Sequence, residues 1–154
     1  MIIWRGWGFL AVVYIGLCAA FFGGLIGASL LQSSTAAGPL AGLGILLGGA
    51  LTALHGWYLN VLRPRTRADQ WEEAERPRLE DAADRGALVV GNTRPSSPEE
   101  AAQMIESVIA DGRRTLGRHG PHSVFWIPME IIGILAMVGG VILAGATLVG
   151  ALTG

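Results

Sequence analysis

Two charged side chains lie outside the polar part of the chain and could form an ion pair. Arg5 stands in "IIWRGWG" and Glu130 in "FWIPME", each next to an apolar segment, whereas every other charged residue lies between Arg63 and His122. A charge at membrane depth costs roughly 3 kcal/mol unless it is paired or hydrated. We therefore expect Arg5 to pair with Glu130 and to join the first membrane helix to the third. The alternative is that Glu130 only favours a helix start and Arg5 only sets the topology.

Two further titratable side chains, His55 and Tyr14, lie inside apolar segments. At 1.5 Å per residue, His55 is about 10 Å from the end of its segment, and Tyr14 has a comparable depth. Ionisable groups at such depth are functional candidates, so His55 and Glu130 could handle protons together. We favour a simpler interpretation, in which His55 is hydrogen-bonded across helices and Tyr14 is a candidate for the contact.

Metal binding could be argued from His119 and His122 in "HGPH", with Glu130 as a third ligand. We do not favour it, because Gly and Pro interrupt the spacing and zinc takes three or four protein ligands. No phosphate-binding loop, dinucleotide motif or Ser/His/Asp pattern with a recognisable context is found. We therefore expect no catalytic residue, no metal and no cofactor. The net charge of −1 gives no reason to expect a nucleic-acid partner.

The composition predicts an integral membrane protein. Of the 154 residues 51% are hydrophobic and only 15% are charged, far from the balance of a soluble domain. Three apolar segments, 7–31, 39–62 and 124–152, exceed the roughly 20 residues that cross a bilayer. The first two should form a helical hairpin within residues 1–62, joined by "QSSTAAGP" with Pro39 at the start of the second helix. The predicted fold is all-α, with a third transmembrane helix within residues 123–154.

Arginine placement predicts the topology. Arg5, the cluster of Arg63, Arg65 and Arg67, and the "GRRTLGRH" before the third helix should all face one side. By the positive-inside rule the N-terminus and the 63–122 insertion are cytoplasmic, and the C-terminus lies outside a bacterial inner membrane. The three clustered arginines are also predicted to bind anionic lipid head groups.

Tryptophans mark the same membrane face. Trp4, Trp7, Trp57 and Trp126 all fall near the predicted cytoplasmic ends of apolar segments, whereas the outer ends have no aromatic residue. We expect these four side chains to anchor the helices at the interface.

The insertion should contain one amphipathic helix over about 98–116. Ser97 can cap it, Pro98 fits its first turn, Glu100 completes a capping box and Gly117 offers a stop. Its apolar face holds Ala101, Met104, Ile105, Val108 and Ile109. The preceding charged stretch, interrupted by Pro77 and containing a strand-like "ALVV", is expected to be solvated.

Small residues recur four apart within the apolar segments, which lets helices approach closely. The sequence leaves open whether these contacts lie within the chain or between chains. The residues are Gly23 and Gly27, Gly44 and Gly48, and Ala136, Gly140 and Ala144.

The segments "IWRGWG" (3–8) and "HSVFWIPMEIIG" (122–133), and more loosely "GWYLNVLRPR" (56–65), resemble small uncharacterised bacterial membrane proteins. These open with Trp-Arg-Gly-Trp-Gly, carry a helical hairpin and re-enter the membrane through His-x-x-Phe-x-x-Pro-Met. The resemblance implies no activity, but it implies that the N-terminal and third-helix motifs belong together.

The expected function is a non-catalytic accessory or scaffold subunit of a larger inner-membrane complex for energy transduction or transport. The small size, the glycine-rich helix faces and the apolar stripe on the cytoplasmic 98–116 helix suggest that the chain belongs to a larger membrane assembly. The first alternative is a small channel or transporter component that uses His55 and Glu130. The second is a membrane-surface protein that acts through its arginines, and an enzyme acting on lipid is a minor one.

Overall fold

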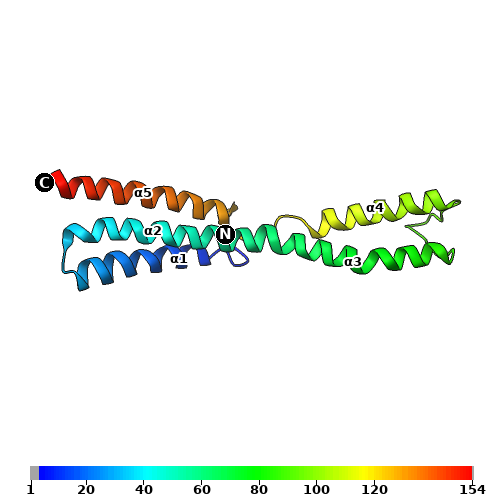
Figure 1. The fold of residues 1–154 in the computed structure, drawn as a ribbon, viewed down its shortest axis with the longest axis horizontal. Coiled ribbons are helices and arrows are strands. Elements are labelled where there is room, and N and C mark those ends of the chain that lie inside the picture. The colour runs from blue at the N-terminus through cyan, green and yellow to red at the C-terminus, as the bar shows by residue number, and fades with distance from the viewer. Residues whose placement is uncertain (1–3, 154) are drawn as a thin grey trace. The chain divides into compact units, whose positions relative to one another are not determined.

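The computed structural model describes residues 4–153 and divides the chain into two compact units. The membrane unit comprises Met1–Asn60 and Pro121–Gly154, and the polar hairpin comprises Val61–Gly120. Nearly all of the regular structure is helical (Figure 1). The all-α prediction is therefore confirmed, apart from three two-residue strands.

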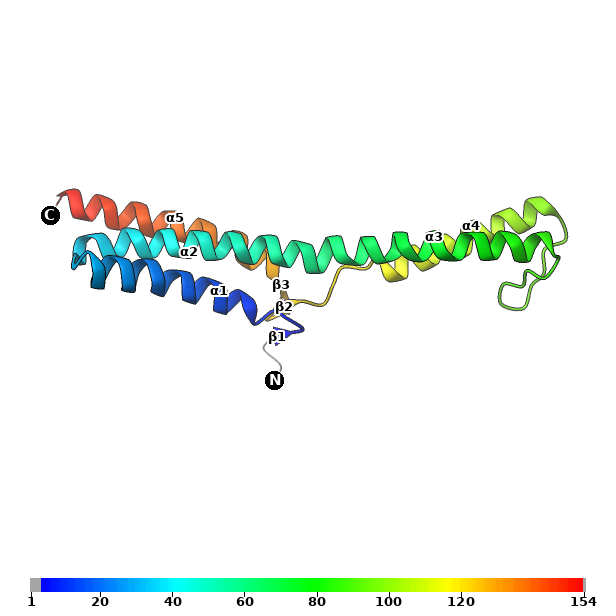
Figure 2. The same cartoon turned by 60° about the horizontal axis from the view of Figure 1, so that its bottom comes forward.

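Three helices are long and apolar enough to cross a membrane. The first is α1 (Leu10–Ala19), which continues as the π-helix η1 (Ala20–Leu30). The second is α2 (Ser34–Trp57), followed by the π-helical turn η2 (Tyr58–Leu62), and the third is α5 (Met129–Thr153). In both views α2 lies between α1 and α5 (Figures 1 and 2), so α2 provides most of the packing surface of the unit.

The second helix begins at Ser34, whereas the sequence pattern predicts a start at Pro39, five residues later. Ser33 caps it, because its hydroxyl oxygen accepts a hydrogen bond from the Ala36 N–H at 3.2 Å. Pro39 therefore lies inside the helix, where it has no N–H to donate to the Thr35 carbonyl. The connection to η1 is correspondingly short, and "STAAGP" is helix rather than loop.

Glycines bring the three membrane helices together. A Cβ on Gly23 would lie 2.6 Å from the Cβ of Ala41, and one on Gly48 would lie 2.7 Å from the Cα of Ile15. On the other side of α2, a Cβ on Gly140 would lie 2.6 Å from the Leu46 nitrogen. These glycine contacts lie within the chain, which answers the question that their spacing left open.

The third span is preceded by a small antiparallel sheet. Its strands are β1 (Trp4–Arg5), β2 (Ser123–Val124) and β3 (Ile127–Pro128), in the order β1-β2-β3. Trp4 is opposite Val124 and Arg5 is opposite Ser123. The helix α5 begins at Met129, five residues after the start of the apolar segment at residue 124, and Pro128 ends the strand that precedes it.

The polar hairpin consists of two antiparallel helices, α3 (Arg63–Asp84) and α4 (Pro98–Leu116) (Figure 1). The helix α4 has the predicted bounds, and the Ser97 hydroxyl accepts from the Glu100 N–H. The helix α3 was not predicted, and its charged stretch is one helix that runs through Pro77. The strand-like "ALVV" contributes only an isolated bridge between Val90 and Thr93.

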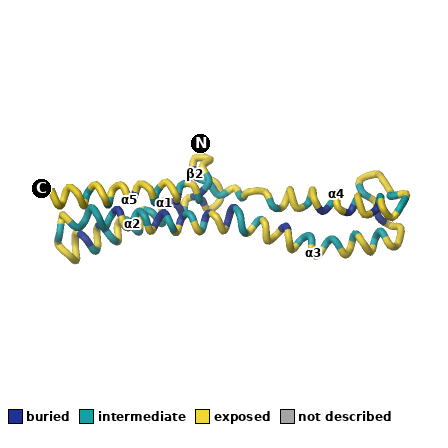
Figure 3. The backbone as a smooth tube through the Cα atoms, turned by 45° about the horizontal axis from the view of Figure 1, so that its top comes forward, coloured by how far each residue is buried: buried dark blue, intermediate teal, exposed yellow. Residues whose placement is uncertain are grey.

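The core of the polar hairpin covers the apolar stripe of α4. Ala101, Ile105 and Ile109 are buried together with Leu88, and Trp71 and Leu79 of α3 pack against them. Figure 3 shows buried positions along α4. From the sequence alone, this apolar stripe predicts a protein partner. The covering surface is instead α3 and the loop that follows it, so the hairpin has its own core.

Candidate functional site

Asn60, in η2, is the centre of a buried hydrogen-bond network. Its side chain has no exposed surface. Its Nδ2 donates to the His122 carbonyl at 2.9 Å and to the Glu130 carboxylate at 2.7 Å, and its Oδ1 accepts from the His122 N–H at 3.1 Å. Both amide hydrogens and the carbonyl are therefore used, as a buried amide requires. We call Asn60, His122 and Glu130 the asparagine junction.

The junction ties together two points that are far apart in the sequence. Asn60 is the last residue of the membrane unit before the polar hairpin, and His122 is the second residue after it. The Met129 N–H also donates to the His122 carbonyl, at 3.2 Å. A Cβ on Gly56 would lie 2.6 Å from the Glu130 nitrogen, so glycine one turn before Asn60 lets α5 approach.

The His122 side chain connects the same junction to the N-terminal segment. Its Nδ1 accepts a hydrogen bond from the Trp7 N–H at 3.1 Å, so the neutral ring carries its proton on Nε2. The ring lies so close to Gly6, at φ +56°, that a Cβ there would overlap it. The structure thus brings "WRGWG", "GWYLN" and "HSVFWIPME" into one site.

The expected ion pair between Arg5 and Glu130 is not among the ion pairs of residues 4–153, all of which involve residues 69–113. Arg5 is exposed, and the partner shown for the Glu130 carboxylate is Asn60. Glu130 lies in the first turn of α5, as the alternative required. Asn60 was missed, although a lone amide within an apolar segment is the signal that could have found it.

His55 and Tyr14 are in direct contact across α1 and α2. The Tyr14 hydroxyl lies 2.8 Å from the His55 Nδ1. They line an open groove of about 460 Å³ together with Leu51, Leu54 and Tyr58. Because His55 contacts Tyr14 and Glu130 contacts Asn60, the structure does not show the joint arrangement of His55 and Glu130 that the proton-handling hypothesis used.

The tryptophans flank the junction. Trp7 precedes α1, Trp57 ends α2 and Trp126 precedes α5, and all three side chains are exposed. The Trp4 side chain lies outside the described part of the chain. Phe125 and Trp126 form the turn between β2 and β3 with φ of +48° and +64°. Positive φ at two aromatic residues is strained, so the turn holds Trp126 outward at an energetic cost.

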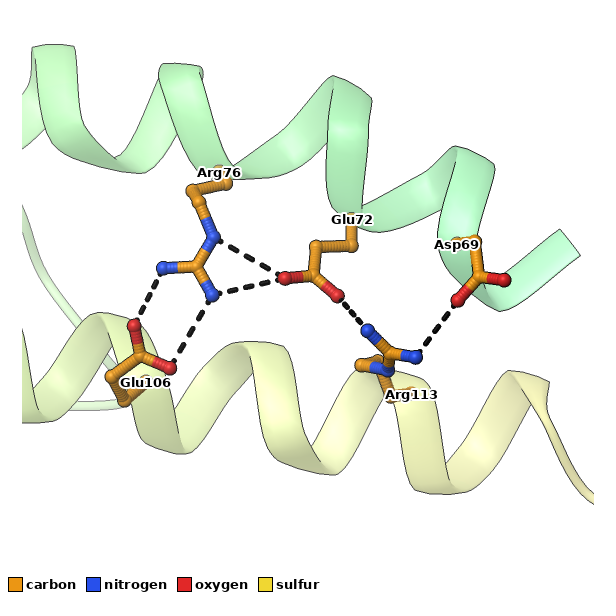
Figure 4. Close-up of polar contacts among 5 residues, drawn as sticks. All are labelled: Asp69, Glu72, Arg76, Glu106 and Arg113. Atoms are coloured by element: carbon orange, nitrogen blue, oxygen red, sulfur yellow. Dashed lines mark hydrogen bonds and ion pairs between the residues drawn. The ribbon is translucent and has the colours of Figure 1, made fainter. Parts of the chain in front are cut away.

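A second network of polar side chains joins α3 to α4 (Figure 4). Arg76 binds Glu72 and Glu106, whereas Arg113 binds Asp69 and also Glu72. The hydrogen bond from Arg76 holds the pKa of both Glu72 and Glu106 below its usual value, with Arg113 adding to the effect at Glu72. Exposed pairs of this kind each contribute little to stability, but they align the two helices.

The predicted lipid-binding arginines, Arg63, Arg65 and Arg67, lie in the first turns of α3 and are all exposed. Among residues 4–153, no group of three or more His, Cys, Asp or Glu side chains could hold a metal ion. Comparison of the chain with protein-family models, curated proteins and solved structures gave no match.

Proposed function

We propose that the protein is a non-catalytic accessory or scaffold subunit of a larger bacterial inner-membrane complex, of the energy-transducing or transport kind. The asparagine junction is the observation that carries this proposal. It is buried and hydrogen-bonded to the main chain, and it fixes the points at which the polar hairpin leaves and re-enters the membrane unit. Such an arrangement suits a molecule that holds a domain in place.

The proposed orientation has the N-terminus and residues 61–120 in the cytoplasm and the C-terminus outside. The start of α1, the end of α2 and the start of α5 meet at the junction, where exposed tryptophans gather. Arg5 and the arginines at the start of α3 flank the same ends, in agreement with the positive-inside rule.

The outer face of α5 is the surface that best suits a protein partner within the bilayer. Only 11% of the apolar 18-residue stretch within α5 is buried, less than in the other two long apolar helices. Exposed side chains along it include Ile131, Leu135, Val138 and Ile142. The glycines and the apolar stripe of α4, from which the sequence predicts protein partners, make their contacts within the chain. The outer face of α5 is therefore the surface that we propose for a partner.

Affinity purification from native membranes in a mild detergent tests the proposal. We expect a stoichiometric partner subunit with the wild-type chain. Val138→Trp adds bulk to the outer face of α5 and should release that partner, while Val12→Trp, at a similarly exposed position on α1, should retain it. Recovery of only a monomer or a homo-oligomer from the wild-type membranes contradicts the proposal.

A channel or transporter component is the second candidate, because the Tyr14–His55 contact places two titratable side chains beside an open groove. Proton flux into proteoliposomes separates the two functions. A channel should lose flux on His55→Ala, whereas a scaffold subunit should show no flux above that of empty vesicles with or without this change.

A further inference from the structure

One end of the polar hairpin carries arginines and no carboxylates. Residues 61–68 and 114–120 contain no Asp or Glu. They are neighbours in the antiparallel hairpin, because a Cβ on Gly117 would lie 3.7 Å from that of Ala68. The arginines of these two stretches, which we call the arginine collar, are Arg63, Arg65, Arg67, Arg114 and Arg118.

The remainder of the hairpin has the opposite charge. Residues 69–113 contain eleven carboxylates and five arginines, of which Arg76, Arg78, Arg85 and Arg113 bind acidic side chains. The five collar arginines are exposed and take part in none of the ion pairs of residues 4–153. Positive charge is therefore concentrated, without internal compensation, at the end where the chain joins the apolar segments.

We propose that the arginine collar binds the phosphate groups of anionic phospholipids. Arg63 directly follows Leu62, the last residue of the apolar stretch, so the collar begins where head groups begin. Guanidinium groups bind phosphate oxygens in a bidentate geometry that exposed, unpaired arginines can adopt.

The distribution of the collar around the helices favours a bilayer over a single protein partner. At 100° per residue, Arg63 and Arg67 point to one side of α3 and Arg65 to the other. Arg114 lies in the last turn of α4, and Arg118 follows the end of that helix. A docked protein would contact one side, whereas lipid head groups can surround all of them. This property is independent of whether the chain has a protein partner.

Native mass spectrometry of the full chain in detergent can measure the affinities for phosphatidylglycerol and phosphatidylcholine. We expect the wild type to bind phosphatidylglycerol at least about tenfold more tightly. The triple variant Arg63→Gln, Arg65→Gln, Arg67→Gln should reduce this preference to within about twofold. The matched variant Arg78→Gln, Arg85→Gln, Arg94→Gln removes the same charge elsewhere in the hairpin and should keep it.

Circular dichroism verifies the helical content of each variant. If the first triple variant is unfolded, Arg114→Gln with Arg118→Gln replaces it and should reduce the preference at least about threefold. A preference that survives both collar variants, or that the matched variant loses equally, overturns the proposal. Displacement of phosphatidylglycerol by equimolar inorganic phosphate also overturns it, in favour of a site for the free anion.

Discussion

The membrane unit and the polar hairpin are both built from packed helices, but different forces hold them together. In the membrane unit, glycines bring backbones into contact, a buried amide joins η2 to residues 122–130, and the His122 ring joins these to the N-terminal segment. In the hairpin, a stripe of aliphatic side chains is buried and charged residues bridge the outer surface. The packing of the membrane unit suits helices in lipid, where apolar burial provides little drive for association and close packing and hydrogen bonds provide more.

The largest effect should come from removing the buried amide. Asn60→Ala leaves the His122 N–H and the Glu130 carboxylate without the bonds that Asn60 supplies, and should cost the membrane unit about 4 kcal/mol. Thermal unfolding in detergent measures this loss. Asn92→Ala, at an exposed loop position of the hairpin, is the control and should change stability by less than about 0.5 kcal/mol.

Core truncation in the hairpin should come next. Ile109 is 2% exposed at the interface with α3, so Ile109→Ala should cost about 3 kcal/mol. The loss should appear as faster hydrogen exchange confined to residues 61–120. Val89→Ala, at a half-exposed position, serves for comparison, and an equal effect of both changes would show that the hairpin has no specific core.

Two adjacent glycines on α5 test the close packing of helices in the membrane unit. Gly140→Ala brings a methyl group to 2.6 Å from the Leu46 nitrogen and should cost about 2 kcal/mol. Gly139→Ala meets nothing within 4 Å and should be neutral or slightly stabilising. Melting temperatures of the two variants in one detergent measure this difference in stability. Similar values would contradict the packing described for α2 and α5.

The smallest expected effect is a loss of stability at acidic pH that is confined to the hairpin. Arg76 holds the pKa of Glu72 and of Glu106 below the usual value of 4.5. The two carboxylates therefore contribute fully to the folding stability of the hairpin above pH 4.5, and this contribution is lost as the pH falls through their lowered pKa. The protection factors for hydrogen exchange of residues 61–120, which remove the pH dependence of the intrinsic exchange rate, should therefore fall below about pH 4.5. Glu72→Gln should flatten this dependence, whereas Glu73→Gln, outside the network, should leave it steep.

Sequence patterns were sufficient for the features that depend on local chemistry. Apolar length predicted the three helices that are long and apolar enough to cross a membrane, and the Ser97 cap with its following spacing predicted α4. The helix α3 was missed because Pro77 and the density of charge suggested a solvated stretch. Its apolar side chains, such as Trp71 and Leu79, pack against the buried residues of α4, and the local sequence does not reveal that contact.

The site was predicted in part. The N-terminal and third-helix motifs do meet, and His55 does contact Tyr14. The expected partner of Glu130 was Arg5, chosen because the charges are opposite, whereas the structure shows Asn60. A neutral amide wholly within the membrane unit can satisfy a main-chain N–H, a carbonyl and a carboxylate together, and charge counting does not reveal that capacity.

Asn60 holds the entry of α5 in place directly, and it holds the N-terminal segment in place through His122. Hydrogen exchange of the full chain, resolved to peptides covering 4–8 and 121–128, tests it in the wild type and in Asn60→Ala. Both peptides should exchange much faster in the variant while residues 69–113 keep their protection. Unchanged exchange at 121–128, or an equal acceleration along the whole chain, would contradict it.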